Sequence, residues 1–184
     1  DSSFKASAGG LVSALTPLVE RSDGLWIGWE GVKSKENIPQ NNDKYKVKVK
    51  LTEEDYNNYY LGFSNKIIWP LYHNFVDYCH FKEEYWANYL HVQEKFAQVI
   101  FNILEKKDCI WVNDYHIEGI GYELRKLGAK NSLDFFLHVP FPRANVLVNL
   151  PWHKQILIQM LCYDLIGFQA NKDTSNFLEC IGIF

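Results

Sequence analysis

The sequence predicts an α/β protein with a mostly parallel sheet and helices on both of its faces. Short apolar runs, of the kind that fill strands buried on both faces, alternate along the chain with longer stretches of helical periodicity. Two of these runs, at 110–112 and 135–137, stop abruptly at polar residues. Strands and helices that alternate in this way form right-handed crossovers, which make the sheet parallel and cover both faces.

Size and composition indicate one globular domain. The chain has 184 residues, of which 47% are hydrophobic and 16% aromatic, so a sizeable core can form. Its 19 basic and 22 acidic residues are mixed along the chain, which predicts no nucleic-acid or anionic-membrane partner. We find no run near the roughly 20 apolar residues of a membrane span and no signal-peptide pattern at the start.

The cysteines indicate a reducing compartment. They are widely spaced, and Cys109 and Cys162 lie in apolar surroundings, so we expect reduced core thiols and a cytoplasmic protein. Because the chain opens without Met and stops in an apolar stretch, we also expect it to be a piece of a longer protein.

The first predicted element is a helix that a glycine pair opens. Gly9 and Gly10 precede apolar residues at 11, 14, 15, 18 and 19, which keep helical spacing. Glycine lets a backbone approach a ligand closely, and the unpaired N–H groups of a first helical turn favour an anion, so a diphosphate could bind here. The alternative is a glycine turn that only starts the helix.

Two strands and a helix follow in the first half. Leu25–Trp29 is typical of a strand, the polar residues 33–46 of a loop, and Lys46–Leu51 alternates as an edge strand whose lysines face water. Thr52 is a predicted N-cap for a short helix that reaches Tyr59 and Tyr60.

An aromatic-rich stretch and a long helix come next. The aromatic rings of 59–73 suit either a carbohydrate, whose faces are apolar, or an ordinary core margin. The residues from 84 to 106 predict a long amphipathic helix that supports the fold. The remaining expected elements are a strand at 109–112, a helix at 118–127 closed by Gly128, a strand at 133–137, a helix after Pro151, a buried strand at 163–168 and a helix at 173–180.

Polar residues follow two of these strands. Asp114 and His116 come after the strand at 109–112, and His138 comes after the strand at 133–137. Loops at the carboxyl ends of parallel strands line a common crevice, so we expect these three side chains to converge in a site that binds sugar hydroxyls.

Six motifs, taken in order, resemble the amino-terminal domain of the trehalose-6-phosphate synthase family. The resemblance runs from about Lys5 to Phe177, and the start and the Asn-rich loop look closest to animal, arthropod-like forms. The motifs are Lys5–Val12, Leu25–Trp29, Tyr59–Leu71, Trp111–His116, Phe135–Pro142 and Asp164–Gln169.

The resemblance implies a retaining glycosyltransferase of the two-domain GT-B fold. Such an enzyme transfers glucose from UDP-glucose to glucose 6-phosphate in trehalose biosynthesis, gives trehalose 6-phosphate and UDP, and needs no metal or other cofactor. Residues 1–184 would be a single Rossmann-like, acceptor-side domain that lacks its first strand and the carboxyl-terminal nucleotide-sugar domain. The piece alone would be inactive.

The motifs also imply roles for single residues. On the donor side, Gly9 and Gly10 would lie against the diphosphate and glucose, and His138 would bond the transferred glucose. Asp114 would accept from hydroxyls of the acceptor glucose. With His138 it is one of the two residues implied in catalysis.

Three further residues complete the implied acceptor site. Tyr60 would donate its hydroxyl to the acceptor phosphate, Trp69 would wall the pocket, and Val139 would sit where the two sugars meet. The implied mechanism is front-face substitution, in which the departing phosphate helps to take the acceptor's proton, so Asp114 is not a nucleophile. An Arg and Lys pair in the second domain would stabilise the leaving diphosphate.

The chain departs from the family pattern at Asn113, where a His is usual, and at Asn145, where an acidic residue is usual, and it has an unusual Arg143. Two explanations of these changes stay open: neutral drift and altered substrate specificity. Two other functions stay open: a catalytically silent homologue that senses sugar phosphates, and a related transferase with another acceptor. Phosphatase activity on trehalose 6-phosphate, in the same chain or pathway, is an expected partner, and a homo-oligomer is left open.

Overall fold

The computed structural model describes residues 10–29 and 46–184, without the side chains of 10–14. It divides the chain into two compact units, Asp1–Lys50 and Leu51–Phe184, which we describe separately. Gly9, most of the predicted loop at 33–46 and the first motif's opening residues lie outside the described residues.

The first unit holds a helix and a two-stranded parallel sheet. Helix α1 (Gly10–Arg21) begins at the second glycine of the pair, as predicted. Strands β1 (Trp26–Gly28) and β2 (Lys46–Lys48) pair in parallel, and the Val49 N–H extends the pairing to the Gly28 carbonyl at 2.9 Å. The predicted edge strand is therefore present, and it ends three residues earlier than Leu51.

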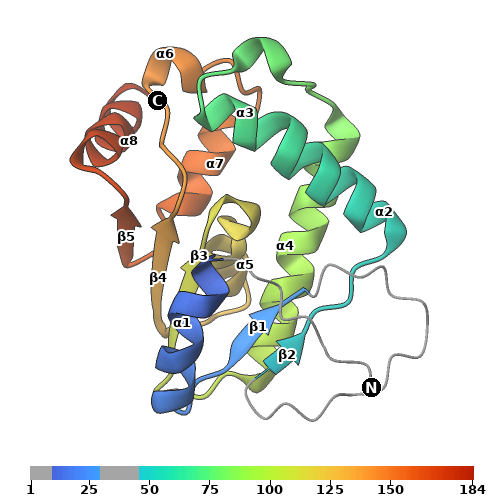
Figure 1. The fold of residues 1–184 in the computed structure, drawn as a ribbon, viewed down its shortest axis with the longest axis vertical. Helices are drawn as coiled ribbons and strands as arrows, with labels where there is room; N and C mark the ends of the chain where they lie inside the picture. The colour runs from blue at the N-terminus through green and yellow to red at the C-terminus, as the bar shows by residue number, and fades with distance from the viewer. Residues whose placement is uncertain (1–9, 30–45) are drawn as a thin grey trace. The chain divides into compact units, whose positions relative to one another are not determined.

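The second unit is built on a parallel sheet in the order β3-β4-β5, which Figure 1 shows. This confirms the predicted α/β class, with a parallel sheet and helices on both faces. Each strand lies where an apolar run predicted one, within a residue or two. The strands are β3 (Cys109–Asn113), β4 (Ser132–Leu137) and β5 (Leu165–Phe168), and the helices that accompany them are α4 (Glu83–Ile103), α5 (Ile120–Lys126), α6 (Ala144–Leu147), α7 (His153–Met160) and α8 (Asn171–Ile183).

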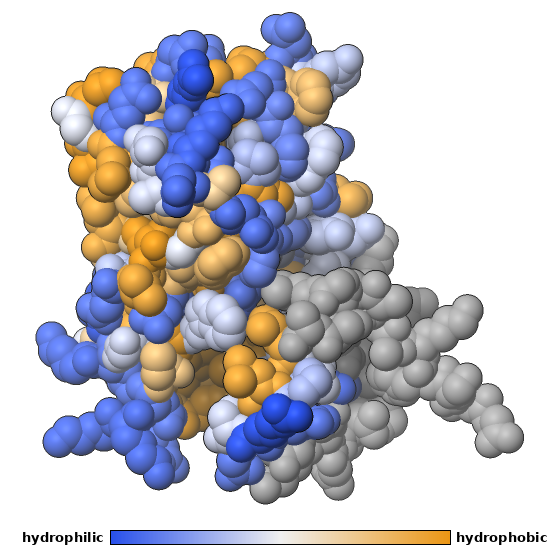
Figure 2. All heavy atoms as spheres, turned by 60° about the vertical axis from the view of Figure 1, so that its left-hand side comes forward, coloured by the Kyte–Doolittle hydropathy of each residue, from blue (hydrophilic) through white to orange (hydrophobic). Residues whose placement is uncertain are grey.

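Strand β5 is less buried than its sequence predicts. Among the described residues it pairs only with β4, so one of its edges carries no strand and Leu165 is 63% exposed. Figure 2 shows hydrophobic side chains gathered on the face that comes forward from the β5 and α8 side of Figure 1. Exposed apolar residues of β5, α7, α8 and the turn after α7 are Leu165, Ile158, Leu161, Leu178 and Ile183.

The helix that follows Thr52 is longer than predicted, and most of it is a π-helix. Thr52 caps it as expected, because its hydroxyl accepts from the Asp55 N–H at 3.1 Å while the Asp55 carboxylate accepts from the Thr52 N–H at 2.8 Å. Lys95 forms an ion pair with the same carboxylate. The chain then continues without a break through α2 (Glu53–Asp55), π-helix η1 (Tyr56–Ile68) and α3 (Trp69–Tyr72).

Aromatic packing against α4 explains why this helix continues. Phe63 of η1 lies 4.2 Å from Tyr89 between ring centroids and 5.4 Å from Trp86, and Trp86 stacks on Trp152 at 5.2 Å. Gly62 lies so close to α4 that a Cβ there would meet the Tyr85 ring at 2.7 Å. Many rings of the aromatic-rich stretch are therefore core, as one of the two interpretations predicts. No helix among the described residues has the length and apolar character needed to cross a membrane.

Two cysteines are placed differently from the prediction. Cys109 is exposed, with its Sγ 3.7 Å from an Asp134 carboxylate oxygen, because it opens β3 at the rim of the sheet. Cys162 is partly exposed, and Cys180 is the buried thiol. All four cysteines are unpaired, as expected.

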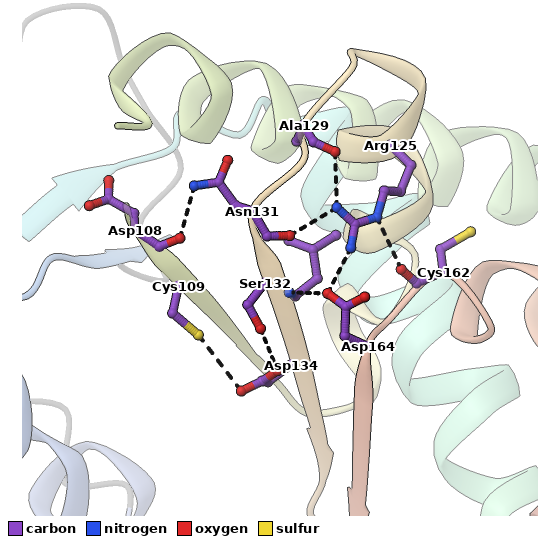
Figure 3. A network of polar contacts seen from close by, with 10 residues as sticks. Asp108, Cys109, Arg125, Ala129, Asn131, Ser132, Asp134, Cys162 and Asp164 are labelled. Carbon is purple, nitrogen blue, oxygen red and sulfur yellow. Dashed lines mark hydrogen bonds and ion pairs between the residues drawn. The ribbon is translucent and has the colours of Figure 1, made fainter. Parts of the chain in front are cut away.

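A guanidinium ties together the amino ends of the strands, as Figure 3 shows. Arg125 of α5 donates to the carbonyls of Ala129 and Asn131, both at 2.9 Å, and to the Asp164 carboxylate at 2.8 Å. The same Asp164 oxygen accepts from the Leu133 N–H at 2.9 Å. One charged side chain thus links the start of β4, the residue before β5 and the helix between β3 and β4.

Replacing Arg125 with Met should lower the free energy of unfolding by about 1–3 kcal/mol, because its charged hydrogen bonds to the loop before β4 and to Asp164 before β5 are lost. Chemical denaturation measures this. Lys154→Met on α7 is the control, because Lys154 is exposed and its replacement should change the free energy of unfolding by less than about 0.5 kcal/mol. Equal losses in the two variants would contradict a special role for Arg125.

Candidate functional site

The carboxyl ends of β3 and β4 bring Asp114 and His138 together. Asn113 ends β3 in register with Phe136 of β4, and the Asp114 N–H donates to the Phe136 carbonyl at 2.8 Å. The His138 N–H in turn donates to Asp114 Oδ1 at 3.2 Å. The two loops therefore lie together, as predicted. Both hydrogen bonds that hold them are donated by backbone N–H groups.

The backbone of Asp114 is strained. Its φ of 75° and ψ of 162° fall in a region that glycine enters freely and other residues rarely adopt. Such a conformation costs on the order of 1–3 kcal/mol and persists where the surrounding structure imposes it, which happens most often at binding and catalytic sites. This conformation places the Asp114 carboxylate where β3 ends, and one of its oxygens accepts from the His138 N–H.

The His116 ring lies beside two tyrosines. Its centroid is 4.0 Å from that of Tyr115 and 5.6 Å from that of Tyr60, and both pairs are stacked. Its carbonyl accepts from Gln93 Nε2 at 3.0 Å, which anchors the turn to α4. Burial lowers the pKa of His116, and the charge of Asp114 partly opposes that effect. A neutral imidazole thus lies between the Asp114 loop and Tyr60 of the π-helix.

The π-helical geometry places Tyr60 and Trp69 on one side. Trp69 follows Tyr60 by nine residues, which is about two full turns at roughly 4.4 residues per turn of a π-helix, but two and a half turns of an α-helix. Tyr56, Tyr60, Asn65 and Trp69 follow this wider period along the less buried side of the helix, which also includes Asn57, Asn58, Leu61 and Lys66. Asn65 Nδ2 also donates to the Tyr60 carbonyl at 2.9 Å. Both predicted acceptor residues therefore face the same way.

Trp69 keeps its ring available to a ligand. It is 42% exposed, and its ring stacks on that of His73 at 4.3 Å. Because His73 Nδ1 also contacts the Trp69 carbonyl at 2.7 Å, the indole is supported from one side.

The remaining residues singled out in the sequence have fewer defined contacts than Asp114 and His138. Val139 is half-buried directly after His138. Gly10 opens α1 in the first unit, which we do not place relative to the second, and Gly9 lies outside the described residues. Arg143 and Asn145 are exposed around the start of α6.

Sequence reasoning missed Glu118, which lies under the Asp114 loop. The residue is fully buried, and its Oε2 accepts from the Tyr72 hydroxyl at 3.0 Å, while its Oε1 has no partner among the described residues. Burial raises the pKa of Glu118 to about 8; the Tyr72 hydrogen bond works against this shift and the Asp114 charge adds to it. The only sequence signal is an acidic residue between apolar ones, a pattern that predicts an ordinary helix start.

Gln169 was missed as well. It follows β5, and its Nε2 lies 3.4 Å from His138 Nδ1, while Asn113 Oδ1 lies 3.0 Å from His138 Nε2. The Asp164–Gln169 motif ended on this residue, but nothing in the spacing indicated which ring it would meet.

Comparison with known proteins gives a consistent result. The profile of glycosyltransferase family 20 matches residues 1–182. A trehalose-6-phosphate synthase of Cronobacter sakazakii is 36% identical over 184 residues, which cover 97% of this chain and 39% of that protein. The chain therefore spans about two fifths of the length of the curated relatives it matches.

Solved structures agree in fold. A structure from E. coli with UDP-2-fluoro glucose bound has a TM-score of 0.89 and 34% identity, over 99% of this chain and 41% of that one. An α,α-trehalose-phosphate synthase (UDP-forming) from Burkholderia xenovorans in complex with glucose 6-phosphate has a TM-score of 0.87 and 33% identity, over 96% of this chain and 40% of that one.

Asp114→Gly should be more stable than Asp114→Ala by about 1–2 kcal/mol, since both lose the carboxylate and only alanine keeps the backbone strain. Chemical denaturation of the two variants measures the difference. The same two substitutions at Asp108, whose φ is not positive, are the control, and there the alanine variant should be the more stable one. Alanine equal to or better than glycine at 114 would contradict the strain.

Glu118→Gln should change how stability depends on pH. The native carboxyl stays protonated to about pH 8, whereas the unfolded chain ionises near the ordinary value of 4.5, so its stabilising effect is lost as pH rises between these values. The slope is at most about 1.4 kcal/mol per pH unit. Glutamine keeps the size and cannot ionise, so the variant gains stability relative to wild type from pH 5 to pH 8. Parallel curves for wild type and variant would count against a buried neutral acid.

Proposed function

Because the chain belongs to glycosyltransferase family 20, we propose that it is the acceptor-side part of a retaining glycosyltransferase that makes trehalose 6-phosphate and UDP. The donor is UDP-glucose and the acceptor is glucose 6-phosphate. The observation that carries this proposal is the strained Asp114, held by the His138 N–H just after β3 and two residues before His116, whose ring stacks on Tyr60. The comparison structures with UDP-2-fluoro glucose and with glucose 6-phosphate support the choice of substrates.

In this proposal the acceptor binds over the π-helix and the Asp114 loop. The Tyr60 hydroxyl donates to the acceptor phosphate, Asp114 accepts from glucose hydroxyls, and Trp69 walls the pocket. Val139 lies where the two sugars meet. A carboxylate bonded to sugar hydroxyls gives charge-assisted hydrogen bonds, which are about twice as strong as neutral ones.

On the donor side, Gly9 and Gly10 would contact the diphosphate at the start of α1, and His138 would bond the glucose that is transferred. The departing phosphate helps to take the acceptor's proton during front-face substitution. Asp114 and His138 act in this step by orienting the two sugars, so no carboxylate attacks the anomeric carbon. Orientation of this kind lowers the barrier by removing the entropic cost of bringing the reactants together.

The second half of the machinery would lie in further polypeptide. We propose that residues 1–184 form an amino-terminal Rossmann-like domain, joined to a preceding strand and to a following nucleotide-sugar domain with an Arg and Lys pair for the leaving diphosphate. The coverage of about two fifths of the relatives supports this, and so do the exposed apolar residues beside β5, since large apolar patches mark interfaces. The isolated piece is accordingly proposed to be inactive.

The finer attributes are also part of the proposal. We place the protein in the cytoplasm, in the trehalose pathway with a phosphatase that acts on trehalose 6-phosphate, and we leave a homo-oligomer open. The relatives compared are bacterial, so the likeness to arthropod forms stays a prediction.

The test is UDP release by the full-length protein from UDP-glucose with glucose 6-phosphate, with fructose 6-phosphate or with no acceptor. We expect release that requires glucose 6-phosphate and falls roughly 10- to 150-fold in Asp114→Asn, the range for one charged hydrogen bond. The exposed Asp77→Asn is the control and should leave the rate unchanged.

Two outcomes would overturn the proposal. No release from a folded protein that still binds glucose 6-phosphate would indicate the silent, sugar-sensing homologue. Release with another acceptor alone would indicate a related transferase of different specificity, in which Asn113 or Arg143 has changed the pocket.

A further inference from the structure

His138 directly follows the middle strand of three, and the carboxyl end of each neighbouring strand supplies a partner to its ring. Asn113 ends β3, His138 follows β4, and Gln169 follows β5. Asn113 Oδ1 is 3.0 Å from His138 Nε2, and Gln169 Nε2 is 3.4 Å from His138 Nδ1. The Phe136 ring packs against the imidazole, with centroids 4.8 Å apart.

A separate contact fixes which atom of Asn113 faces the ring. Asn113 Nδ2 donates to the Trp111 carbonyl at 3.3 Å, and a carbonyl oxygen can only accept. The amide oxygen is therefore the atom turned toward His138. Because an amide oxygen also only accepts, His138 Nε2 must carry the proton of that bond.

The other ring nitrogen then has a lone pair. In a neutral imidazole with its proton on Nε2, Nδ1 is an acceptor, and Gln169 Nε2 donates to it. This bond is long compared with the usual 2.7–3.2 Å, and Gln169 is exposed. A ligand hydroxyl can replace such a partner at little cost, whereas the shorter Asn113 bond stays in place.

We propose that Asn113 is a positioning residue that holds His138 as the Nε2–H tautomer, so that Nδ1 accepts a hydrogen bond from a hydroxyl of the donor sugar. The sugar contact rests on the proposed function; the tautomer does not. Asn113 acts through His138 and needs no proton of its own, which gives a physical reason why an amide serves at this position. Gln169 occupies Nδ1 until the sugar binds.

Nuclear magnetic resonance of the full-length protein with ¹⁵N-labelled histidine, at pH 8, reads the tautomer directly. The His138 signal is assigned by its loss in His138→Gln among six histidines. We expect a protonated Nε2 and an unprotonated Nδ1 in wild type, a mixture in Asn113→Leu, which has similar size and no acceptor, and the wild-type tautomer in Asn113→Asp, which restores an acceptor. An Nδ1–H ring in wild type, or an unchanged tautomer in Asn113→Leu, would overturn the positioning role.

The same signal tests the sugar contact without turnover. Adding UDP-glucose should shift the Nδ1 resonance further than adding UDP alone, because only the former brings a sugar hydroxyl. Equal shifts would overturn the acceptor role of Nδ1, even if Asn113 fixes the tautomer.

Kinetics separate positioning from simple folding. In the full-length enzyme, Asn113→Leu should lower kcat/KM for UDP-glucose about tenfold, the effect of one hydrogen bond, with the KM for glucose 6-phosphate within twofold. Asn113→Asp should recover most of the loss, and Gln169→Leu should cost less than Asn113→Leu. Equal losses for both substrates would mean a structural role only. A full-length protein that releases no UDP would sink the proposed function, while the resonance experiments would still decide the tautomer.

Discussion

The site depends on one constraint, the parallel pairing of β3, β4 and β5. Parallel strands end at the same edge, so residues that are far apart in the chain meet where the strands stop. Here the pairing continues one step past β3, through the Asp114 N–H and the Phe136 carbonyl, and Asp114 adopts its strained conformation at this step. At the opposite edge Arg125 ties the strand starts together, so the register that aligns the site is held at both ends.

Around Asp114 the fold keeps other ionisable groups uncharged. Burial lowers the pKa of His116 and raises the pKa of Glu118, so both favour their neutral forms near neutral pH. Neither of these two side chains is therefore an ion-pair partner of Asp114, which leaves its carboxylate oxygens as acceptors for a ligand's hydroxyl groups. The π-helix contributes the opposite wall, where its wide turn sets Tyr60 and Trp69 on one side.

Much of the central sheet could be predicted from sequence. Apolar runs gave β3 and β4, the polar residues that stop them gave the position of the site, and Gly128, with a φ of 95°, closes α5 as its type predicts. Other features depend on contacts that no local pattern contains. The sequence predicts only a short helix in place of the π-helix, because periodicity arguments assume 3.6 residues per turn and the extension depends on aromatic packing with α4.

The misses have the same cause. Burial by distant elements raises the pKa of Glu118, β5 pairs with only one strand among the described residues, and the partners of His138 come from the ends of two other strands. The most direct test of the account is a crystal structure of the full-length protein with glucose 6-phosphate. The account predicts a glucose hydroxyl within hydrogen-bond distance of the Asp114 carboxylate and the phosphate beside the Tyr60 hydroxyl. A sugar phosphate bound elsewhere, or an Asp114 with relaxed backbone that does not contact it, would contradict the account.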